Sequence, residues 1–218
     1  MILETIPFDF DDDIITRTRC DKITRVHVYN WTDVSVVIGR GGKQDLELMK
    51  QNIIKDEITL YKRPGGGCSV VLDPGNLIIS VALPLPGLAG IKSAFTALSR
   101  WLISALDHCG VPDVRQLGVS DLTIGNRKIG GSCVYRTKDL LYYSTTLLVN
   151  HEFGLVGRYL KHPPREPGYR AGRSHDRFMV SLKEMGLVNA PDRWQTDLEI
   201  ELKKGINQLI EDTGCPQN

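Results

Sequence analysis

The chain contains Arg63-Pro64-Gly65-Gly66-Gly67-Cys68-Ser69, which runs on to Asp73-Pro74-Gly75-Asn76, and further along Gly125-Asn126-Arg127-Lys128-Ile129-Gly130-Gly131-Ser132. The first segment places glycines behind an arginine, so backbone N–H groups can approach an anion while a guanidinium neutralises it. The second places a lysine before another glycine pair. Three successive glycines alone more often form a bend. Together, the two segments predict a pocket in which a carboxylate is activated as a phosphate anhydride.

The composition is that of a globular protein. The chain has 218 residues, 41% of them hydrophobic and 24% charged, which suits one domain with a substantial core. The formal net charge of +1 does not suggest binding to nucleic acid. The five cysteines show no C-x-x-C spacing, which argues against a disulfide framework or a zinc site. The N-terminal residues do not resemble a signal peptide and no apolar run is long enough for a membrane helix, so we expect a cytoplasmic protein.

Hydrophobic patterns outline the secondary structure. Short apolar runs predict strands over 34–38, 77–83, 122–124 and 140–149, and the glycine segment is expected to be a loop between strands. Apolar spacings of three and four predict a helix from Ile91 to Leu106, and a last helix is expected from Leu198 through Leu209, although Gly205 weakens it. Gly125-Asn126 predicts a turn that puts Lys128 on the strand leaving a hairpin. Because strands and helices do not alternate regularly, the fold class is α+β with a mixed, largely antiparallel sheet and flanking helices.

The order of these motifs from about residue 34 to residue 150 resembles the lipoate protein ligase and octanoyltransferase superfamily. The likeness is carried by Val36-Val37-Ile38-Gly39-Arg40, Gln44-Asp45, Tyr61-Lys62-Arg63-Pro64 with its glycines, Asp121-Leu122-Thr123-Ile124 and Arg127 to Ser132. A fainter likeness at Gly172-Arg173-Ser174 and Val180-Ser181-Leu182-Lys183 matches the segment that follows the ligase core. The chain is most similar to lipoate protein ligase A without its C-terminal accessory domain.

This resemblance implies the biotin/lipoate ligase fold, which is related to class II aminoacyl-tRNA synthetases. It implies a single catalytic domain over 1–218, with a core at about 25–187 and a C-terminal helical extension at about 195–214. The implied reaction activates lipoate or octanoate with ATP and Mg²⁺, then transfers the acyl group to a lysine of a lipoyl carrier domain or a glycine cleavage H-like protein. A separate accessory subunit is a candidate partner, because the chain ends soon after Leu187.

The resemblance also assigns roles to residues. Lys128 would bridge the acyl carbonyl oxygen and the α-phosphate, where charge grows in both transition states. Asp121 would orient the nucleotide and is a candidate Mg²⁺ ligand, although no metal site is evident from the sequence. Gly65, Gly66 and Gly67 would leave room for the acyl chain and phosphate, and we expect a branched side chain at Gly66 to stand where backbone and ligand meet and to cost ligand binding. The implied substrate-binding residues are Arg63, Gly65, Gly66, Gly67, Ser69, Asp73, Asn76, Asp121, Gly130, Gly131 and Ser132.

The sequence departs from the family pattern at several positions. Lys62, Cys68 and Leu72 replace an arginine, a glycine and a histidine of the first element, and Tyr142-Tyr143-Ser144-Thr145 lacks a histidine that is usual there. Some of the matching residues also have a structural explanation: Asp73 and Asn76 suit an Asx turn, and Gly130 to Ser132 suit a bulge.

Three other functions remain open. An ATP-independent octanoyl or lipoyl transferase would need a cysteine thioester, and the usual nucleophile positions lack cysteine, which leaves Cys68 and Cys133 as candidates. A non-catalytic scaffold that binds a lipoyl domain would have no reason to keep both Arg63 and Lys128. Biotin ligation is less favoured, because Gly39-Arg40-Gly41-Gly42 only partly imitates the biotin loop.

Overall fold

The computed structural model describes residues 2–88 and 90–215, and its two sheets confirm the predicted α+β class. The larger sheet has six antiparallel strands in the order β2-β6-β10-β9-β8-β7. Their bounds are β2 Arg25–Asn30, β6 Asn76–Leu83, β7 Val114–Leu117, β8 Asp121–Ile124, β9 Arg127–Arg136 and β10 Leu141–Leu148.

The smaller sheet is mixed and contains the strands on either side of the glycine loop. Its order is β1-β4-β3-β5, with β4 parallel to both β1 and β3, and β5 antiparallel to β3. The bounds are β1 Ile6–Pro7, β3 Ser35–Ile38, β4 Thr59–Lys62 and β5 Val70–Leu72. The predicted strand at 34–38 is β3, and the predicted loop lies between β4 and β5.

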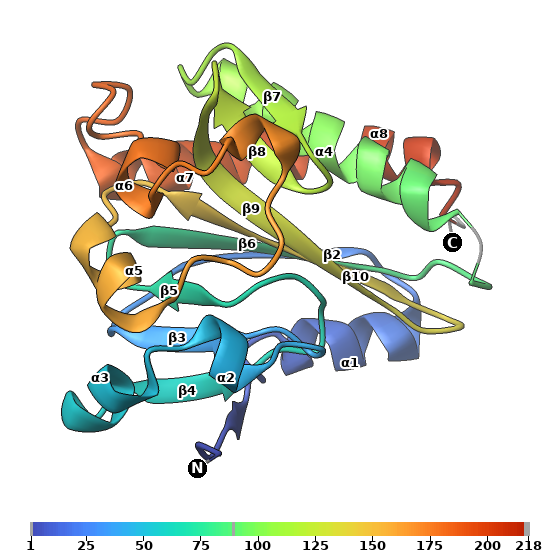
Figure 1. Ribbon diagram of the computed structural model, residues 1–218. Helices are drawn as coiled ribbons and strands as arrows, with labels where there is room; N and C mark the ends of the chain where they lie inside the picture. Colours follow the sequence, from blue (N-terminus) through green and yellow to red (C-terminus); the bar gives the residue numbers. More distant parts are fainter. Residues whose placement is uncertain (1, 89, 216–218) are drawn as a thin grey trace.

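Helices cover the two sheets on different sides (Figure 1). The long helix α4, Ile91–His108, packs with α7, Pro191–Lys204, and α8, Ile206–Thr213, against the larger sheet. On the other side lie α1, Asp12–Asp21, the short helices α2, Gln44–Glu47, and α3, Lys50–Lys55, and α5, Phe153–Tyr159 (Figure 1). The 3₁₀ turn η1, Gly168–Arg170, and α6, His175–Phe178, follow α5.

Most of the apolar core lies between the larger sheet and the helices α4, α7 and α8. Leu98, Leu102 and Leu106 of the predicted helix are all fully buried there, as the spacing required. The predicted C-terminal helix is two helices, because the chain breaks at Gly205. A Cβ at Gly205 would lie 3.0 Å from Cδ1 of Trp101, so a glycine allows the close approach of the helices.

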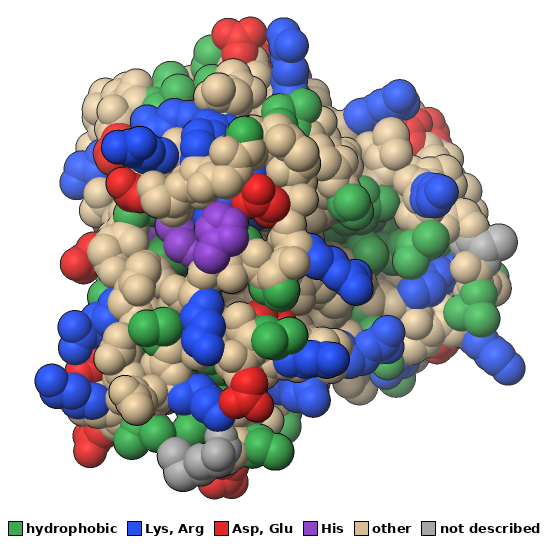
Figure 2. Space-filling view, in the orientation of Figure 1, with side chains coloured by type: hydrophobic (Ala, Val, Ile, Leu, Met, Phe, Trp, Pro, Cys, Tyr) green, Lys and Arg blue, Asp and Glu red, His purple; other side chains and the backbone are tan. Residues whose placement is uncertain are grey.

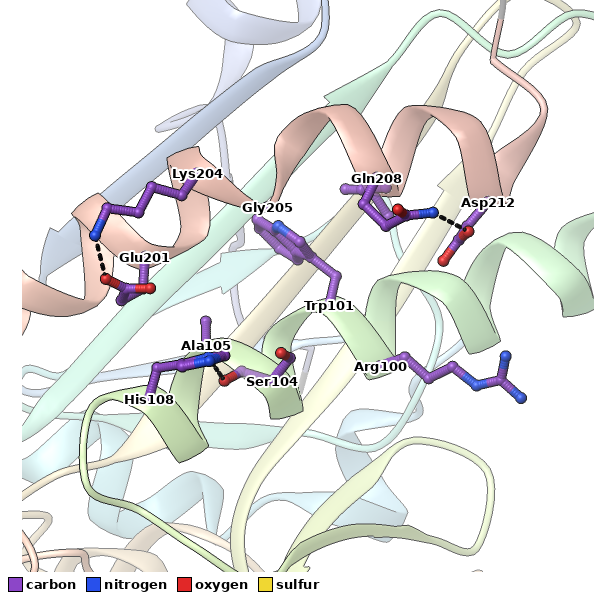
Figure 3. Close-up of a pocket in the computed structure, with 11 residues that line it drawn as sticks. Arg100, Trp101, Ser104, Ala105, His108, Glu201, Lys204, Gly205, Gln208 and Asp212 are labelled. Carbon is purple, nitrogen blue, oxygen red and sulfur yellow. Dashed lines mark hydrogen bonds and ion pairs between the residues drawn. The ribbon is translucent and has the colours of Figure 1, made fainter.

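These three helices enclose a small hollow of about 380 Å³ (Figure 3). Trp101 of α4 and Gly205 lie at its base, and its rim carries side chains of both charges, including Glu201 paired with Lys204 at 2.6 Å. None of the predicted site residues lines it. In the described part of the chain, no helix combines the length and apolar character that crossing a membrane requires.

Candidate active site

The predicted motifs meet at a cavity of about 720 Å³ on the face of the larger sheet opposite α4. Strands β9 and β10 form its floor, and β5 with the glycine loop forms a wall. Its cover is the segment 161–174, which we call the strap. Lys128 and Asp121 line this cavity together with Gly130, Gly131 and the strap residue Tyr169.

A β-bulge points Lys128 into the cavity. Gly131 and Cys133 line the cavity, and strict alternation along β9 would bring Ile129 there and send Lys128 to the opposite face. Leu122 pairs with Gly130, but the next residue of β8 pairs with Lys128, so Ile129 is an extra residue. The bulge reverses the alternation. Ile129 is therefore fully buried in the α4-side core, and Lys128 faces the cavity.

The ammonium of Lys128 is held by a carboxylate in a space that a glycine leaves open. Lys128 Nζ lies 2.6 Å from Asp121 Oδ1, and the two side chains are 24% and 13% exposed. A Cβ at Gly131 would lie 2.9 Å from the same Nζ atom. The β8–β9 register brings Asp121 opposite Gly131, so the glycine and the acid together set the position of the ammonium.

The strap is hydrogen-bonded to this ion pair. The Tyr169 hydroxyl donates to Asp121 Oδ2 over 2.8 Å. Burial and the neighbouring Asp121 carboxylate raise the pKa of Tyr169, so the phenol remains a donor at neutral pH. Tyr169, Asp121 and Lys128 thus form a continuous chain from the strap to the floor of the cavity.

The strap also brings cationic side chains that sequence reasoning did not select. Arg170 lines the cavity, is 4% exposed, and places its guanidinium carbon 4.7 Å from the ring centroid of Phe178. Arg173 donates to the carbonyl oxygens of Asn126 and Tyr169 at 2.9 and 2.8 Å, which ties the strap to the β8–β9 turn. The only signal for this segment was its faint family likeness at Gly172 to Ser174. Side chains of both charges and histidines lie together on the face that carries the strap (Figure 2).

Arg63 braces the glycine loop. Its guanidinium donates to the carbonyl oxygens of Val37 at 3.2 Å, Gly66 at 2.8 Å and Cys68 at 2.7 Å. Gly67 follows with φ of +94°, a conformation that favours glycine. Arg63 lines the cavity, as predicted, but its nitrogens already hold the loop, so the structure supports a positioning role more directly than a contact with phosphate.

The steric requirement in the loop lies at Gly65. A Cβ there would lie 2.7 Å from Cys133 Sγ, whereas a Cβ at Gly66 would meet no atom within 4 Å. The protein itself therefore leaves room for a side chain at Gly66, and the restriction expected there from a ligand stays a prediction. Gly65 is buried against β9, and Gly66 is exposed.

Ser69 is fixed by a carboxylate that sequence analysis missed. Its backbone N–H and hydroxyl donate to Glu47 Oε2 at 2.7 and 2.8 Å, and Lys43 N donates to Glu47 Oε1 at 2.9 Å. Glu47 is 7% exposed and ends α2. The nearby Gln44-Asp45 was noted only for its family likeness. Ser69 does line the cavity.

Asp73 and Asn76 stabilise a turn between β5 and β6, and neither lines the cavity. Asn76 Oδ1 accepts the Asp73 N–H at 2.8 Å, and Asp73 accepts the N–H groups of Gly75 and Glu152 at 2.9 and 2.7 Å. Burial raises the pKa of Asp73, but the His151 ring, with Nδ1 3.1 Å from Asp73 Oδ1, and the backbone hydrogen bonds outweigh it, so the pKa is lowered overall. The structure thus favours the Asx-turn explanation over direct substrate binding.

The Ser132 hydroxyl lies on the face opposite the cavity. It is 2.8 Å from the Tyr143 hydroxyl and 2.5 Å from Thr145 Oγ1. These two residues alternate along β10 with the cavity-lining Ser144 and Thr146. Gly130, Gly131 and the backbone of Ser132 form the expected wall, but the Ser132 side chain does not.

The two cysteines at the cavity are poor candidates for a thiolate. Burial raises the pKa of the Cys68 thiol, with a contribution from the carboxylate of Glu47. Burial also raises the pKa of Cys133, despite the opposing effect of Arg63. Both thiols are therefore protonated at neutral pH, the form that does not attack an acyl group.

The described residues hold no group of three or more histidine, cysteine, aspartate or glutamate side chains that could bind a metal ion by themselves. A Mg²⁺ that arrives with a nucleotide has a different requirement, because it keeps substrate phosphates and water and needs only one or two carboxylates. Asp121 fits that lesser requirement.

Comparison with known proteins places this arrangement in a family. Residues 5–195 match the model of the lipoyl protein ligase A/B catalytic domain. The chain belongs to this family. Among curated relatives, a probable lipoate-protein ligase A of Mycoplasma genitalium is 28% identical over 172 residues, which are 78% of this chain and 50% of that protein. Lipoate–protein ligase 2 of Staphylococcus aureus is 31% identical over 176 residues, which are 81% of this chain and 50% of that protein. This family member thus spans about half the length of these relatives.

Solved structures confirm the fold. A putative lipoate protein ligase of Thermoplasma acidophilum with bound lipoic acid superposes with a TM-score of 0.74 and 20% identity, covering 92% of this chain and 78% of that one. A lipoate-protein ligase A bound with ATP gives a TM-score of 0.76 and 21% identity, with 96% and 84% covered. The predicted biotin/lipoate ligase fold is therefore correct.

Proposed function

We propose that this family member is a lipoate protein ligase. It activates lipoate or octanoate with ATP to the acyl-adenylate and transfers the acyl group to a lysine of a lipoyl carrier domain. The observation that supports this best is Lys128, which a β-bulge aims into the cavity beside Asp121 within the family's matched region.

In the first step a carboxylate oxygen of the acid attacks the α-phosphorus, and pyrophosphate leaves with the bonding electrons. Negative charge grows on the phosphoryl oxygens, where the fixed Lys128 ammonium stabilises it. In the second step the acceptor lysine, as a neutral amine, attacks the acyl carbonyl, AMP leaves, and the amine loses a proton. Lys128 then supports the developing oxyanion.

The Lys128–Asp121 pair also has a role before the chemistry. Asp121 neutralises the ammonium, so the partly buried lysine is not left as an unpaired charge. Phosphate oxygens would take over this contact from Asp121. The released carboxylate is the residue of this chain that would hold Mg²⁺ brought by the nucleotide, and such an ion would neutralise phosphate charge.

Relatives support the proposed partners. One solved structure, from Thermoplasma acidophilum, is that of a bipartite lipoate protein ligase and its E2 lipoyl domain. We propose the same kind of carrier for this chain, with a glycine cleavage H-like protein as a second candidate. An accessory subunit that completes the adenylation half is a further part of the proposal, motivated by the bipartite arrangement of that relative.

The transferase alternative is less well supported. It needs a thiolate in the cavity, and burial keeps both Cys68 and Cys133 protonated. A scaffold without turnover would not require the ammonium of Lys128 to face the cavity.

Intact-mass spectrometry of a lipoyl carrier domain tests the proposal. The carrier is incubated with this protein, lipoate, ATP and Mg²⁺, and we expect a mass increase of one lipoyl group. A parallel incubation with preformed lipoyl-AMP and no ATP tests the transfer half alone. Modification only with lipoyl-AMP would indicate that an accessory subunit is needed, whereas no modification in either reaction would contradict the ligase function.

A further inference from the structure

A buried arginine of the strap lines the cavity. Arg170 is only 4% exposed, although an arginine is almost never fully buried unless it is paired. Burial lowers the pKa of its guanidinium, and the carboxylates of Glu166 and Asp121 oppose that effect. The group stays charged, because an arginine is not deprotonated in proteins. The cavity therefore contains a positive charge that the steps proposed for Lys128 do not use.

The described residues occupy only part of this guanidinium. Its Nε donates to the Arg173 carbonyl oxygen at 3.0 Å, and its Nη2 lies 3.4 Å from His175 Nδ1, which must accept because arginine has no acceptor. An arginine has five N–H groups, and these contacts use two of them. Across residues 2–88 and 90–215, neither hydrogen of Nη1 has a hydrogen-bond partner. Those hydrogens are available to a ligand.

The counter-ion of Arg170 is shared with other groups. Glu166 Oε2 lies 3.5 Å from Arg170 Nε and 2.9 Å from His162 Nε2. The other oxygen, Oε1, accepts the backbone N–H of Gly172 at 3.0 Å, and the Glu166 side chain is 30% exposed. Taking a cation out of water is costly unless close partners satisfy it. A carboxylate divided in this way leaves charge on Arg170 for an anion in the cavity.

Arg170 approaches the same part of the cavity as Lys128, but from the strap. Tyr169, the preceding residue, donates to Asp121 at 2.8 Å, and Asp121 holds Lys128 Nζ at 2.6 Å. The ring of Phe178, with its centroid 4.7 Å from the guanidinium carbon, restricts where the Arg170 side chain can lie. Lys128 comes from the floor on β9, so two cations lie on different walls around one space.

The adenylation step asks for more than one cation. Its transferred and leaving phosphates both carry negative charge, and enzymes of phosphoryl transfer place fixed cations and N–H donors on both. Lys128 is assigned to the α-phosphate, and the nitrogens of Arg63 already hold the glycine loop. Arg170 has unused hydrogens and lines the cavity. Its place and charge suit the remaining phosphates.

We propose that Arg170 binds the β- and γ-phosphates of the nucleotide and stabilises pyrophosphate as it leaves. The inference rests on the proposed function. A carboxylate oxygen of the acid forms a bond to the α-phosphorus, the bond from that phosphorus to the bridging oxygen breaks, and its electron pair leaves with pyrophosphate. The planar guanidinium can donate to two phosphate oxygens at once, in a fixed geometry that an ammonium lacks. Arg170 thus acts in adenylation and not in transfer to the carrier.

Calorimetry of the full chain tests which phosphates Arg170 holds. The probes are inorganic pyrophosphate and AMP, each with Mg²⁺. We expect Arg170→Gln to weaken pyrophosphate binding about 10-fold to 100-fold, which is the worth of a hydrogen bond to a charged group. AMP lacks the β- and γ-phosphates, so its affinity should stay within about threefold of the parent value. Arg170→Lys keeps the charge without the planar fork and should recover part of the pyrophosphate affinity.

Arg177→Gln is the matched control for charge. Arg177 is exposed on α6 and is not among the residues that line the cavity. Its replacement removes one positive charge, as Arg170→Gln does, but removes no donor from the cavity. We expect Arg177→Gln to bind pyrophosphate as the parent does.

Transfer from preformed lipoyl-AMP to the carrier separates this role from a structural one. The strap is hydrogen-bonded to Asp121, so a variant in which the strap misfolds should also transfer poorly. We expect Arg170→Gln to transfer within about threefold of the parent rate, because no pyrophosphate takes part in that step. Loss of this transfer would make Arg170 a structural residue of the strap and overturn the inference.

The remaining results distinguish this inference from the ligase function. A parent protein that does not bind pyrophosphate, or an Arg170→Gln variant that binds it equally well, would overturn the inference alone. Equal losses for pyrophosphate and AMP would assign Arg170 to the α-phosphate and overturn it too. If the parent modifies the carrier from neither ATP nor lipoyl-AMP, the ligase function is contradicted, and the leaving-group role is lost with it.

Discussion

Lys128 Nζ and Asp121 Oδ1 are 2.6 Å apart, although seven positions separate the two residues in the sequence and a turn intervenes. Their contact depends on the β8–β9 pairing and on the bulge at Ile129. Tyr169 holds the other oxygen of the same carboxylate. One carboxylate therefore joins the ammonium of Lys128 on β9 to the strap.

Replacing Lys128 by alanine should abolish catalysis with little loss of stability. We expect a rate loss on the order of 10²-fold or more, as for other fixed electrostatic stabilisers. Tyr169 still donates to Asp121, so we expect a stability loss of about 1 kcal/mol, or roughly 3 °C in Tm. Adenylate formation, carrier modification and thermal unfolding measure these effects. Lys138→Ala, at an exposed position on the β9–β10 turn, is the control. Activity within about threefold of the parent would remove Lys128 from the mechanism.

Valine at Gly65 should be far more damaging than valine at Gly66. A side chain at Gly65 would collide with Cys133, whereas a Cβ added at Gly66 would meet no protein atom within 4 Å. We expect Gly65→Val to lose binding of lipoyl-AMP and Gly66→Val to keep it within about tenfold. Calorimetry with a stable analogue of lipoyl-AMP gives both values. Equal losses in the two variants would mean that the loop is restricted by the ligand and not by β9.

The cysteines distinguish ligase from transferase. Since ATP activation needs no thiolate, Cys68→Ser and Cys133→Ser should each retain most of the activity. A thioester mechanism would instead fail completely at one of them and leave an acyl adduct on the parent protein. Carrier modification and the intact mass of the enzyme report both results. Transfer from acyl carrier protein without nucleotide, with the acyl group trapped on either cysteine, would favour the transferase.

Asp73→Asn should destabilise the fold in a pH-dependent way. The folded-state pKa of Asp73 is lowered, so its carboxylate stabilises the protein above the ordinary pKa of 3.8, and this contribution is lost as the pH falls toward the lower folded value. We expect a loss on the order of 2–4 kcal/mol at neutral pH, which shrinks in acid. Urea unfolding of parent and variant across this range measures it. A variant that unfolds like the parent but no longer binds substrate would restore Asp73 to the binding site.

Local sequence patterns determined most of the elements around the site. The apolar spacing of three and four gave α4, since a helix repeats on that period, and Gly125-Asn126 gave the turn before Lys128. The glycine loop between strands and the α+β class also followed from the sequence. The strand Arg25–Asn30, the edge strand Val114–Leu117 and helix α1 were not predicted, because polar and charged residues occupy much of each segment and weaken its apolar pattern.

The tertiary structure decided which of the predicted site residues act together. No local pattern distinguishes a lysine that faces the cavity from one that faces the core, because a single extra residue at Ile129 reverses the alternation and is visible only in the pairing with β8. The same holds for Ser132, whose hydroxyl faces away, and for Glu47 and Tyr169, which reach the site from other parts of the chain. The sequence by itself determined the residue types that can activate a carboxylate. The pairing of strands, the bulge and the strap decided which of those residues meet.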